Sequence, residues 1–400
     1  MMAWLEHVLL ATAIVLMVPV GVFTLQVLLA APGRRRATDG VSATLRRPGL
    51  AVLMPAHDEA VGIADALQTV RAQLEAGDRL LVVADNCSDA TARIAAAAGS
   101  EVVERFDPTL RGKGYALDFG VRHLQHAPPE VVVIVDADCA LGPGALDTLA
   151  RECGRTGRPV QALYLMHAPP GAGLKTRIAA FAWVVKNQVR PLGFRRLGLP
   201  CQLMGTGMAF PWALLRDAPL ACGHIVEDMQ LGLDLANAGA APSFCPEALV
   251  TSTFPSSASG IAEQRSRWEQ GHLAVIAKEG PHALWRAITH RRVDLAAMVL
   301  DLSVPPLTML VMLLTVQSAV NAVAFGLGHS PAALKLALLA LALVALAVAV
   351  AWARFARHIV SARELLGAPL YVLSKLPLYA RFFKRGKREW VRTKRDQRRD

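Results

Sequence analysis

The chain has 400 residues, of which 53% are hydrophobic and 19% are charged, and its formal net charge is +11. Its mean hydropathy of +0.35 is unusual for a soluble protein and indicates membrane segments. Six cysteines occur without a CxxC pair or a framework spacing, so the sequence predicts reduced thiols and argues against a disulfide-stapled secreted domain.

The first apolar segment covers residues 8–31, carries no charge and is long enough to span a bilayer. No basic region precedes it, and Arg34, Arg35 and Arg36 follow it, which is the reverse of a cleaved signal peptide. The positive-inside rule therefore predicts that the N-terminus faces out and that the chain from residue 34 faces the cytoplasm.

Two further apolar segments follow late in the chain. Residues 295–327 contain Asp301 and are interrupted by Pro305-Pro306, whereas residues 332–353 are almost pure Leu, Ala and Val and are followed by basic residues. The three segments together predict three membrane crossings with a cytoplasmic C-terminal end. Because a charge inside a bilayer is costly, Asp301 is interpreted either as a functional acid or as a residue at the membrane boundary.

The C-terminal end is interrupted and then strongly basic. Residues 367–383 contain two prolines and a lysine, which favours an interfacial or re-entrant helix. Residues 384–400 hold nine Lys/Arg against three Asp/Glu, which suits a cytoplasmic tail facing anionic lipids. Nucleic acid is the competing partner for such a tail, and the neighbouring membrane segments argue against it.

Strands alternate with helices between the first and second membrane segments. This alternation predicts a parallel, doubly wound α/β sheet. Residues 131–135 are the predicted central strand, because five consecutive β-branched residues are typical of a strand buried on both faces. The other predicted strands of this half cover residues 50–54, 80–84 and 101–105.

Two carboxylates follow the central strand. Asp136 and Asp138 are spaced i, i+2, and a turn after the strand lets both converge on one point. Hard divalent cations take such oxygen ligands together with the phosphates of a substrate, so the pair is a candidate Mg²⁺ site. The alternative is an Asp-rich loop that caps the next helix.

Polar residues also follow the neighbouring strands. Pro55, His57 and Glu59 follow the first strand and Asp85 ends the second, so that together with the Asp pair they would line one crevice suited to a nucleotide. The chain has neither a GxGxxG motif nor a P-loop motif. Lys113, between two glycines, either reaches a phosphate or a base or belongs to an ordinary turn.

The pattern changes in the second half of this block. Residues 160–166 are a predicted strand. Residues 171–199 form a predicted amphipathic helix whose aromatic and basic side chains favour the membrane interface, with a core helix as the alternative. Residues 203–210 are a strand or tight loop, in which Gly205 and Gly207 permit close approach of the backbone to a ligand.

Glu227 and Asp228 precede a predicted helix. Capping by the helix dipole is one interpretation of these acids, and a base that takes a proton from an attacking hydroxyl is the other. Further along, Gln264, Arg267 and Trp268 share a helix face. Arginine suits a diphosphate because its planar fork donates two hydrogen bonds, and tryptophan offers a flat wall for a sugar ring. Taken alone, these residues would equally suit a surface helix.

In this order the residues resemble the motifs of the membrane-embedded family 2 glycosyltransferases, the group of cellulose, hyaluronan and poly-N-acetylglucosamine synthases and ceramide glucosyltransferase. That family has a first Asp, a DxD, a (T/E)D and a QxxRW. The matching residues here are Asp85, Asp136-Ala137-Asp138, Glu227-Asp228 and Gln264-Arg265-Ser266-Arg267-Trp268. The resemblance covers residues 48–290 and the flanking membrane helices, and it implies a GT-A fold with transmembrane helices.

The resemblance implies a role for each matching residue. Asp85 would hold the uracil of a UDP-sugar, and Asp136 and Asp138 would position the diphosphate and bind Mg²⁺ or Mn²⁺. Asp228, beside Glu227, would be the general base of a single inverting displacement. The other implied contacts are Pro55, His57, Glu59 and Lys113 in the nucleotide pocket, Gln264, Arg267 and Trp268 at the pyrophosphate, and Gly205, Thr206, Gly207 and Trp268 on the acceptor side.

The family context implies a lipid-linked or growing polysaccharide acceptor, with membrane lipids and other polysaccharide-assembly proteins as partners and no nucleic acid. It also implies a multi-pass protein of the cytoplasmic (inner) membrane of a bacterium, with its catalytic domain in the cytoplasm. The implied domains are a membrane helix at 1–33, a glycosyltransferase domain at 48–290, membrane and interfacial helices at 294–383 and a basic tail at 384–400.

Two other classes of protein compete with this interpretation. One is a catalytically silent scaffold that binds a nucleotide-sugar within a polysaccharide assembly complex, and the complete set of motifs argues against it. The other is a nucleotidyltransferase that makes an activated sugar, which would need neither the QxxRW motif nor three membrane segments.

Overall fold

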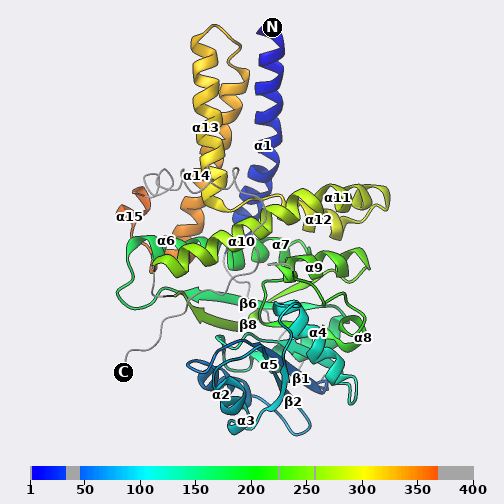
Figure 1. Ribbon diagram of the computed structural model, residues 1–400. Helices are drawn as coiled ribbons and strands as arrows, with labels where there is room; N and C mark the ends of the chain where they lie inside the picture. Colours follow the sequence, from blue (N-terminus) through cyan, green and yellow to red (C-terminus); the bar gives the residue numbers. More distant parts are fainter. Residues whose placement is uncertain (1, 33–45, 224–225, 256–257, 368–400) are drawn as a thin grey trace. The chain divides into compact units, whose positions relative to one another are not determined.

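The computed structural model describes residues 2–32, 46–223, 226–255 and 258–367, with side chains described from residue 4 onward and, in the last range, from residue 267 (Figure 1). The chain divides into two compact units. Among the described residues, the first unit holds 2–32, 172–198 and 276–367, and the second holds 46–171 and 199–275. The predicted interfacial helix at 367–383 and the basic tail lie outside the described residues, except for Gly367.

The second unit is built on an eight-stranded sheet with the order β3-β2-β1-β4-β7-β6-β8-β5. All five predicted strands before residue 200 are confirmed. The apolar residues of β1, β2 and β6 are largely buried, and β4 is buried along its whole length as expected for a central strand, whereas β3 is partly exposed. The strands are β1 (Leu50–Ala56), β2 (Arg79–Asp85), β3 (Glu101–Arg105), β4 (Val131–Ile134), β5 (Ala140–Leu141), β6 (Val160–His167), β7 (Met208–Pro211) and β8 (Ser243–Thr253).

The first half of the sheet is parallel, as the sequence predicts. Val52 of β1 pairs with Leu80 of β2 on one side and with Val133 of β4 on the other, so the carboxyl ends of these strands lie at one edge. The crossover helices are α2 (Ile63–Arg71), α3 (Thr91–Ala97) and α4 (Lys113–Leu124), and α5 (Ala145–Thr156) follows β5. This topology collects the residues that follow each strand at a common edge.

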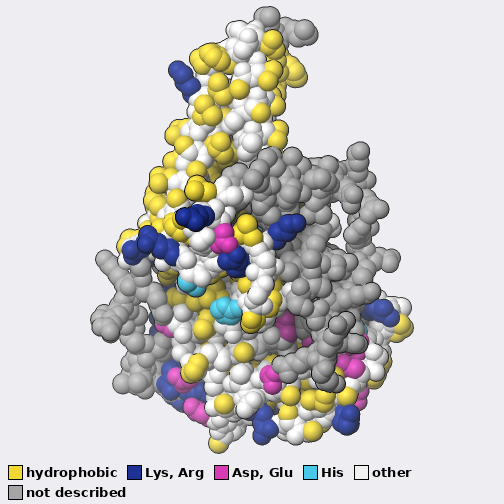
Figure 2. Space-filling model, turned by 90° about the vertical axis from the view of Figure 1, so that its left-hand side faces the viewer, with side chains coloured by type: hydrophobic (Ala, Val, Ile, Leu, Met, Phe, Trp, Pro, Cys, Tyr) yellow, Lys and Arg dark blue, Asp and Glu magenta, His cyan; other side chains and the backbone are white. Residues whose placement is uncertain are grey.

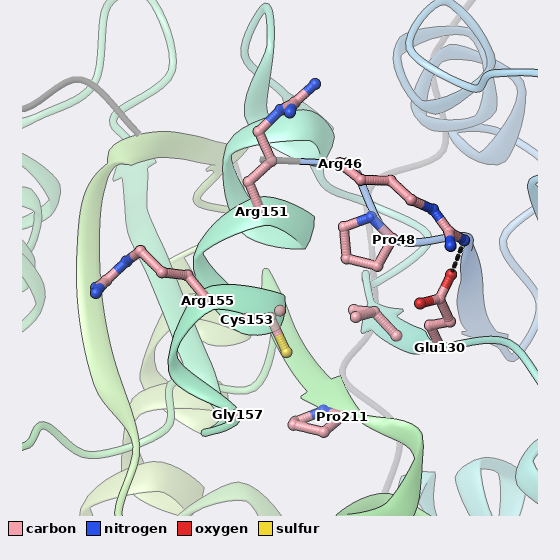
Figure 3. Close-up of a pocket in the computed structure, with 10 residues that line it drawn as sticks. Arg46, Pro48, Glu130, Arg151, Cys153, Arg155, Gly157 and Pro211 are labelled. Carbon is pink, nitrogen blue, oxygen red and sulfur yellow. Dashed lines mark hydrogen bonds and ion pairs between the residues drawn. The ribbon is translucent and has the colours of Figure 1, made fainter. Parts of the chain in front are cut away.

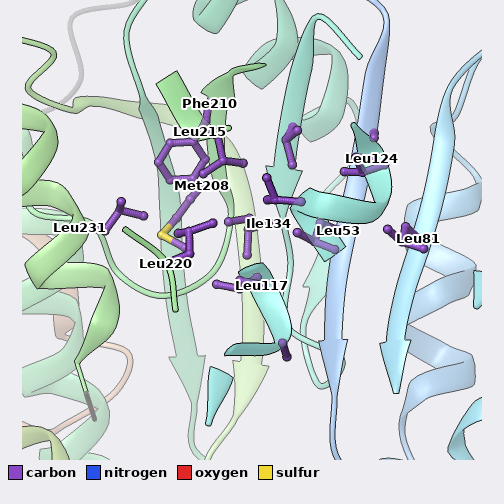
Figure 4. Packing of buried hydrophobic residues seen from close by; sticks show 14 of the residues in the cluster. Leu53, Leu81, Leu117, Leu124, Ile134, Met208, Phe210, Leu215, Leu220 and Leu231 are labelled. Atoms are coloured by element: carbon purple, nitrogen blue, oxygen red, sulfur yellow. The ribbon is translucent and has the colours of Figure 1, made fainter. Parts of the chain in front are cut away.

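A hydrophobic core joins this half of the sheet to α4. Leu53, Leu81 and Ile134 belong to one buried cluster with Leu117 of α4 (Figure 4). Burial of each such side chain contributes about 1.5–3 kcal/mol. A Cβ at Gly120 would lie 2.4 Å from Leu53 Cδ1, so glycine is needed for α4 to approach β1 this closely.

The second half of the sheet departs from the parallel expectation. β7 runs antiparallel to both β4 and β6, while β6 and β8 are parallel, so the sheet is mixed. The predicted strand at 203–210 begins only at Met208, because Gly205 and Gly207 have positive φ angles of 89° and 64° that form a loop before it. β8 was not predicted, because Pro246 interrupts its sequence pattern. The proline lies near a shift in the pairing register of β8 with β6, which falls between Ala162 and Leu163 of β6.

The first unit contains the three predicted apolar helices. Helices α1 (Met2–Ala30), α13 (Leu307–Gly326) and α14 (Ala332–Ala351) are long and apolar enough to cross a membrane. Hydrophobic side chains cover most of their visible surface in Figure 2. The second predicted segment is divided, because Pro306 is the N-cap of α13 and a separate helix, α12 (Val293–Leu302), precedes it.

The predicted amphipathic helix at 171–199 is also part of the first unit. It consists of α6 (Leu174–Val184), a π-helical turn (Val185–Val189) and α7 (Arg190–Arg195). Ile178, Phe181 and Val184 are buried, as a core helix would require. The basic residues of this segment do not all lie on an exposed face as an amphipathic helix would require, because the Arg190 side chain is 91% buried.

Arg190 is buried because it joins a polar cluster of three helices. Its Nε donates to Gln26 Oε1 of α1 at 3.1 Å, and its Nη2 donates to Asp301 Oδ1 of α12 at 2.8 Å and to the Asp301 carbonyl at 2.6 Å. Gln26 Nε2 also donates to Asp301 Oδ1 at 2.6 Å. Asp301 therefore serves as an internal partner that ties α1, α7 and α12 together, which explains a charge in an apolar segment.

Candidate active site

The two acids after β4 lie together at the carboxyl edge of the sheet. Asp136, Asp138 and Cys139 place ligand atoms within 4.8 Å of one another, so this group could hold a metal ion. β5 separates both acids from the following helix, α5, whose N-cap is Gly144. This separation argues against the capping interpretation of the Asp pair.

The donor set of this group favours a hard cation. Burial, with the charges of Asp138 and Asp136, holds the pKa of the Cys139 thiol well above its usual range, so the sulfur stays protonated. A protonated thiol is a poor metal ligand. The two carboxylates are the suitable donors, and carboxylate oxygens fit Mg²⁺ or Mn²⁺.

Lys113 links these acids to a second acidic pair. Its Nζ forms an ion pair with Asp136, donates to the Gly205 carbonyl at 2.7 Å and lies 3.9 Å from Glu227 Oε1. Burial lowers the pKa of Lys113, but the charges of Asp136, Glu227 and Asp228 raise it by more, so its net pKa is above the ordinary value. Lys113 therefore stays cationic, and the ordinary-turn interpretation does not account for its position.

Glu227 and Asp228 occupy the first turn of α9 (Glu227–Asn237). Burial raises the pKa of Glu227, the charge of Lys113 lowers it and the charge of Asp228 raises it, and the net pKa is about 8. Asp228 Oδ2 lies 3.5 Å from the position that a Cβ at Gly205 would take, and Lys113 Nζ lies 3.8 Å from the same position. The predicted acidic pair and the predicted glycine loop thus meet around Lys113.

The glycine loop is held by a residue that the sequence did not single out. Gln161 of β6 is fully buried, donates through Nε2 to the Thr206 carbonyl at 2.9 Å, and accepts from Met204 N–H at 2.8 Å. Thr206 Oγ1 in turn accepts from the backbone N–H of Asp136 at 3.0 Å. A lone glutamine inside a predicted strand carries no motif signal, so only the fold identifies this brace.

The residues predicted for the nucleobase lie around the ends of β1 and β2. Asp85 is 6% exposed, and its Oδ1 accepts from Arg105 Nη1 at 2.6 Å and from Asn86 Nδ2 at 3.1 Å. His57 Nδ1 lies 2.6 Å from the Asp85 carbonyl oxygen, which gives this histidine a local contact. Arg105 was missed in the sequence, although its place opposite Asp85 in the β2–β3 register explains the pairing.

Pro55 and Glu59 serve the backbone of the same region. Pro55 lies within β1, beside Val83 of β2, and Glu59 N–H donates to Thr91 Oγ1 at 2.7 Å. Asp58, Cys87 and Asp89 form a second group whose ligand atoms lie within 4.8 Å of one another. Its carboxylates already accept backbone hydrogen bonds from Ser88, Ala60 and Thr91, so they join two loops.

Gln264, Arg267 and Trp268 lie on α10 (Ala258–Lys278). The side chain of Gln264 is outside the described part, and Arg267 and Trp268 are half-buried. A Cβ at Gly271, about one turn later on the same helix, would lie 2.6 Å from Val226 Cγ1. Val226 directly precedes Glu227. α10 therefore packs against the residue that leads into the acidic pair.

A separate cavity of about 330 Å³ lies at the opposite edge of the sheet (Figure 3). It is bounded by Pro48 before β1 and by Glu130 before β4, and none of the predicted site residues line it. Its lining arginines already have carboxylate partners, as Arg46 has Glu130 at 2.6 Å. This cavity is therefore separate from the place where the predicted site residues converge.

A mixed α/β sheet that carries acids at the ends of its strands defines a GT-A-like nucleotide-sugar transferase. Residues 48–271 match the family model described as glycosyltransferase like family 2. Because this match covers more than half of the chain, the protein belongs to glycosyltransferase family 2.

A solved structure shares this fold. The mannosyltransferase PcManGT from Pyrobaculum calidifontis, solved with GDP-Man and Mn²⁺, has a TM-score of 0.52 and 19% identity, covering 86% of this chain and 98% of its own. Glucosyl-3-phosphoglycerate synthase from Mycobacterium tuberculosis, solved with Mn²⁺, UDP and glucosyl-3-phosphoglycerate, has a TM-score of 0.38 and 21% identity, covering 55% and 76%. No curated protein sequence matches this chain.

Proposed function

We propose that this family 2 glycosyltransferase is a metal-dependent, inverting enzyme that transfers a sugar from a UDP-sugar to a lipid-linked or growing polysaccharide acceptor. We further propose a membrane-embedded, cellulose-synthase-like type that acts at the cytoplasmic face of a bacterial inner membrane in exopolysaccharide synthesis. The observation that carries the proposal is the convergence of Asp136, Lys113, Glu227 and Asp228 around the loop at Gly205.

The donor diphosphate would lie between the Asp pair and Lys113. Asp136 and Asp138 would hold Mg²⁺ or Mn²⁺, which offsets the charge that builds on the departing nucleotide. Lys113 supplies a permanent positive charge at the same place and begins α4, whose N-terminal N–H groups also favour phosphate. Asp85 and His57 would contact the uracil side of the donor, with Arg105 fixing the Asp85 carboxylate.

Asp228 is the proposed general base. With a pKa of about 8, Glu227 is largely protonated at neutral pH, which assigns the base role to Asp228 of the two adjacent acids. Asp228 takes the proton of the acceptor hydroxyl, the oxygen attacks the anomeric carbon, and the bond from that carbon to the diphosphate breaks. Arg267 and Trp268 would hold the pyrophosphate and shape the acceptor side.

The donor assignment is tested by the release of nucleoside diphosphate from several UDP-sugars and from GDP-mannose, with and without a lipid extract. We expect release from one UDP-sugar, stimulation by lipid and loss of activity on chelation. Turnover of GDP-mannose alone would overturn the uridine assignment. Nucleotide binding without any transfer would favour the scaffold interpretation.

Asp228→Asn tests the base assignment. We expect retained donor binding and a fall in transfer rate of about 10²–10⁴-fold, because the hydroxyl loses its proton acceptor. Asp217→Asn is the matched control, since the Asp217 side chain is 72% exposed and lies in the same unit. Undiminished transfer by Asp228→Asn would refute the assignment.

A further inference from the structure

Helix α11 (Gly280–Thr289) presents its larger apolar side chains outward. Trp285 is 67% exposed, Ile288 is 64% exposed and Leu284 is 39% exposed, and with the exposed Pro281 they follow the i, i+3, i+4, i+7 spacing of one helix face. A helix of a soluble protein directs such a stripe toward its core. In α11 the apolar stripe instead faces away from the protein.

The inward face of α11 is made of small residues. Gly280, Ala283 and Ala287 are buried, and α11 packs against α12, the helix that carries Asp301. Val293 at the start of α12 is 70% exposed and adds to the outward apolar surface. Protein contacts thus account for the small side chains of α11 and leave the large ones uncovered.

Basic residues surround the apolar stripe. Lys278 and Arg291 are exposed and Arg286 is half-buried. Lys278 forms an ion pair with Glu279 at 3.6 Å, and Arg292 forms one with Asp294 at 2.6 Å. An apolar face bordered by lysine and arginine matches an acyl chain region bordered by anionic headgroups. A second copy of the chain would bring the same basic residues against each other, which disfavours self-association through this face.

The position of α11 within the first unit fits the same partner. Figure 1 shows α11 and α12 running across the direction of α1, α13 and α14, at the end of the bundle where α12 leads into α13. A helix that crosses this direction at the end of the membrane-spanning segments lies in the plane of the interface. It would enter the leaflet in which α13 begins.

We propose that α11 is an interfacial helix that inserts Leu284, Trp285 and Ile288 into an anionic lipid leaflet. This inference rests on the proposal that α1, α13 and α14 span a bilayer. α11 begins two residues after the end of α10, the helix that carries Arg267 and Trp268. Neither sequence segment predicted to be interfacial includes α11.

The test uses the full chain reconstituted into nanodiscs whose lipids carry bromine on the acyl chains, since bromine quenches nearby tryptophan emission. Subtracting the emission of Trp285→Phe from that of the unchanged protein isolates Trp285. We expect loss of most of this emission, with stronger quenching by bromine near the headgroup than by bromine near the chain end. Trp212→Phe isolates a half-buried tryptophan of the second unit, for which we expect little quenching.

Trp4→Phe separates this inference from the membrane proposal, because Trp4 is 70% exposed at the start of α1. Quenching of Trp4 without quenching of Trp285 would overturn the interfacial helix alone, and quenching of neither would overturn the spanning helices as well. A Trp285 that is shielded from both bromine and aqueous acrylamide would indicate a protein partner and also overturn the inference.

The lipid charge is tested by comparing phosphatidylglycerol with phosphatidylcholine nanodiscs. We expect stronger quenching of Trp285 in phosphatidylglycerol and a smaller difference between the two lipids for the double variant Arg286→Gln/Arg291→Gln. Equal quenching in the two lipids would overturn the assignment of an anionic leaflet.

Discussion

Replacement of Arg190 by methionine should destabilise the first unit strongly. The variant keeps an unbranched apolar side chain but removes the guanidinium that donates to Gln26 Oε1, to Asp301 Oδ1 and to the Asp301 backbone carbonyl. The Asp301 carboxylate would remain buried, with Gln26 Nε2 as its remaining partner among these groups. An uncompensated buried charge is the costly outcome, because the medium around it solvates it poorly.

The magnitude follows from the burial of both charged partners. The side chains of Arg190 and Asp301 are 9% and 12% exposed, so solvent screens their interaction little. Removal of one partner from a buried pair costs about 3–5 kcal/mol. For a unit of this size that loss corresponds to a fall in Tm of roughly 10 °C. The double variant Arg190→Met/Asp301→Leu should recover most of the stability, because no charge is left buried.

Thermal unfolding of the purified protein in detergent measures this effect. Arg195→Met is the matched control, since Arg195 is an exposed arginine of the same helix and such a charge contributes about 0–1 kcal/mol. A single Arg190→Met variant as stable as the control would refute the reasoning. So would a double variant less stable than Arg190→Met, because the cost would then come from lost packing.

Two further predictions concern the candidate active site. Gln161→Leu removes both hydrogen bonds that hold the loop at Met204 and Thr206, so we expect a loss of about 1–3 kcal/mol in thermal unfolding and slower transfer. Gln161→Glu retains the acceptor for Met204 N–H. It should therefore keep more activity than Gln161→Leu if the hydrogen bonds to the loop support transfer. For Glu227, a folded pKa of about 8 exceeds the ordinary value of 4.5, so its contribution to stability is fully present below pH 4.5 and lost by about pH 8. The Tm of Glu227→Gln should therefore fall less over this window than that of the unchanged protein, and parallel Tm profiles would contradict the raised pKa.

The sequence predicts the parallel half of the sheet because its signals are local. Runs of β-branched residues identify the strands, and acids at the strand ends predict the edge of the sheet that holds the candidate active site. The spacing between Asp136 and Asp138 is short enough that the turn after β4 alone brings them together. These features depend on a few neighbouring residues, which a single sequence displays directly.

The missed features depend on contacts between distant segments. Arg105 pairs with Asp85 across two strands, and Gln161 reaches a loop more than forty residues away. The sequence alone favours a surface position for Arg190, because its partner Asp301 lies 111 residues further along the chain. β8 was missed for a different reason, because a proline inside a strand contradicts the local pattern and only its pairing with β6 explains it.

The assignment of residues 172–198 to the first unit has a consequence for biogenesis. The chain leaves the second unit after β6, contributes α6 and α7 to the first unit, and returns to the second unit before β7. During synthesis, Arg190 emerges long before Asp301, so its charge has no α12 partner until the chain has grown by 111 residues. Contacts of such long sequence separation form late. Synthesis halted before α12 would therefore leave the arginine without its carboxylate.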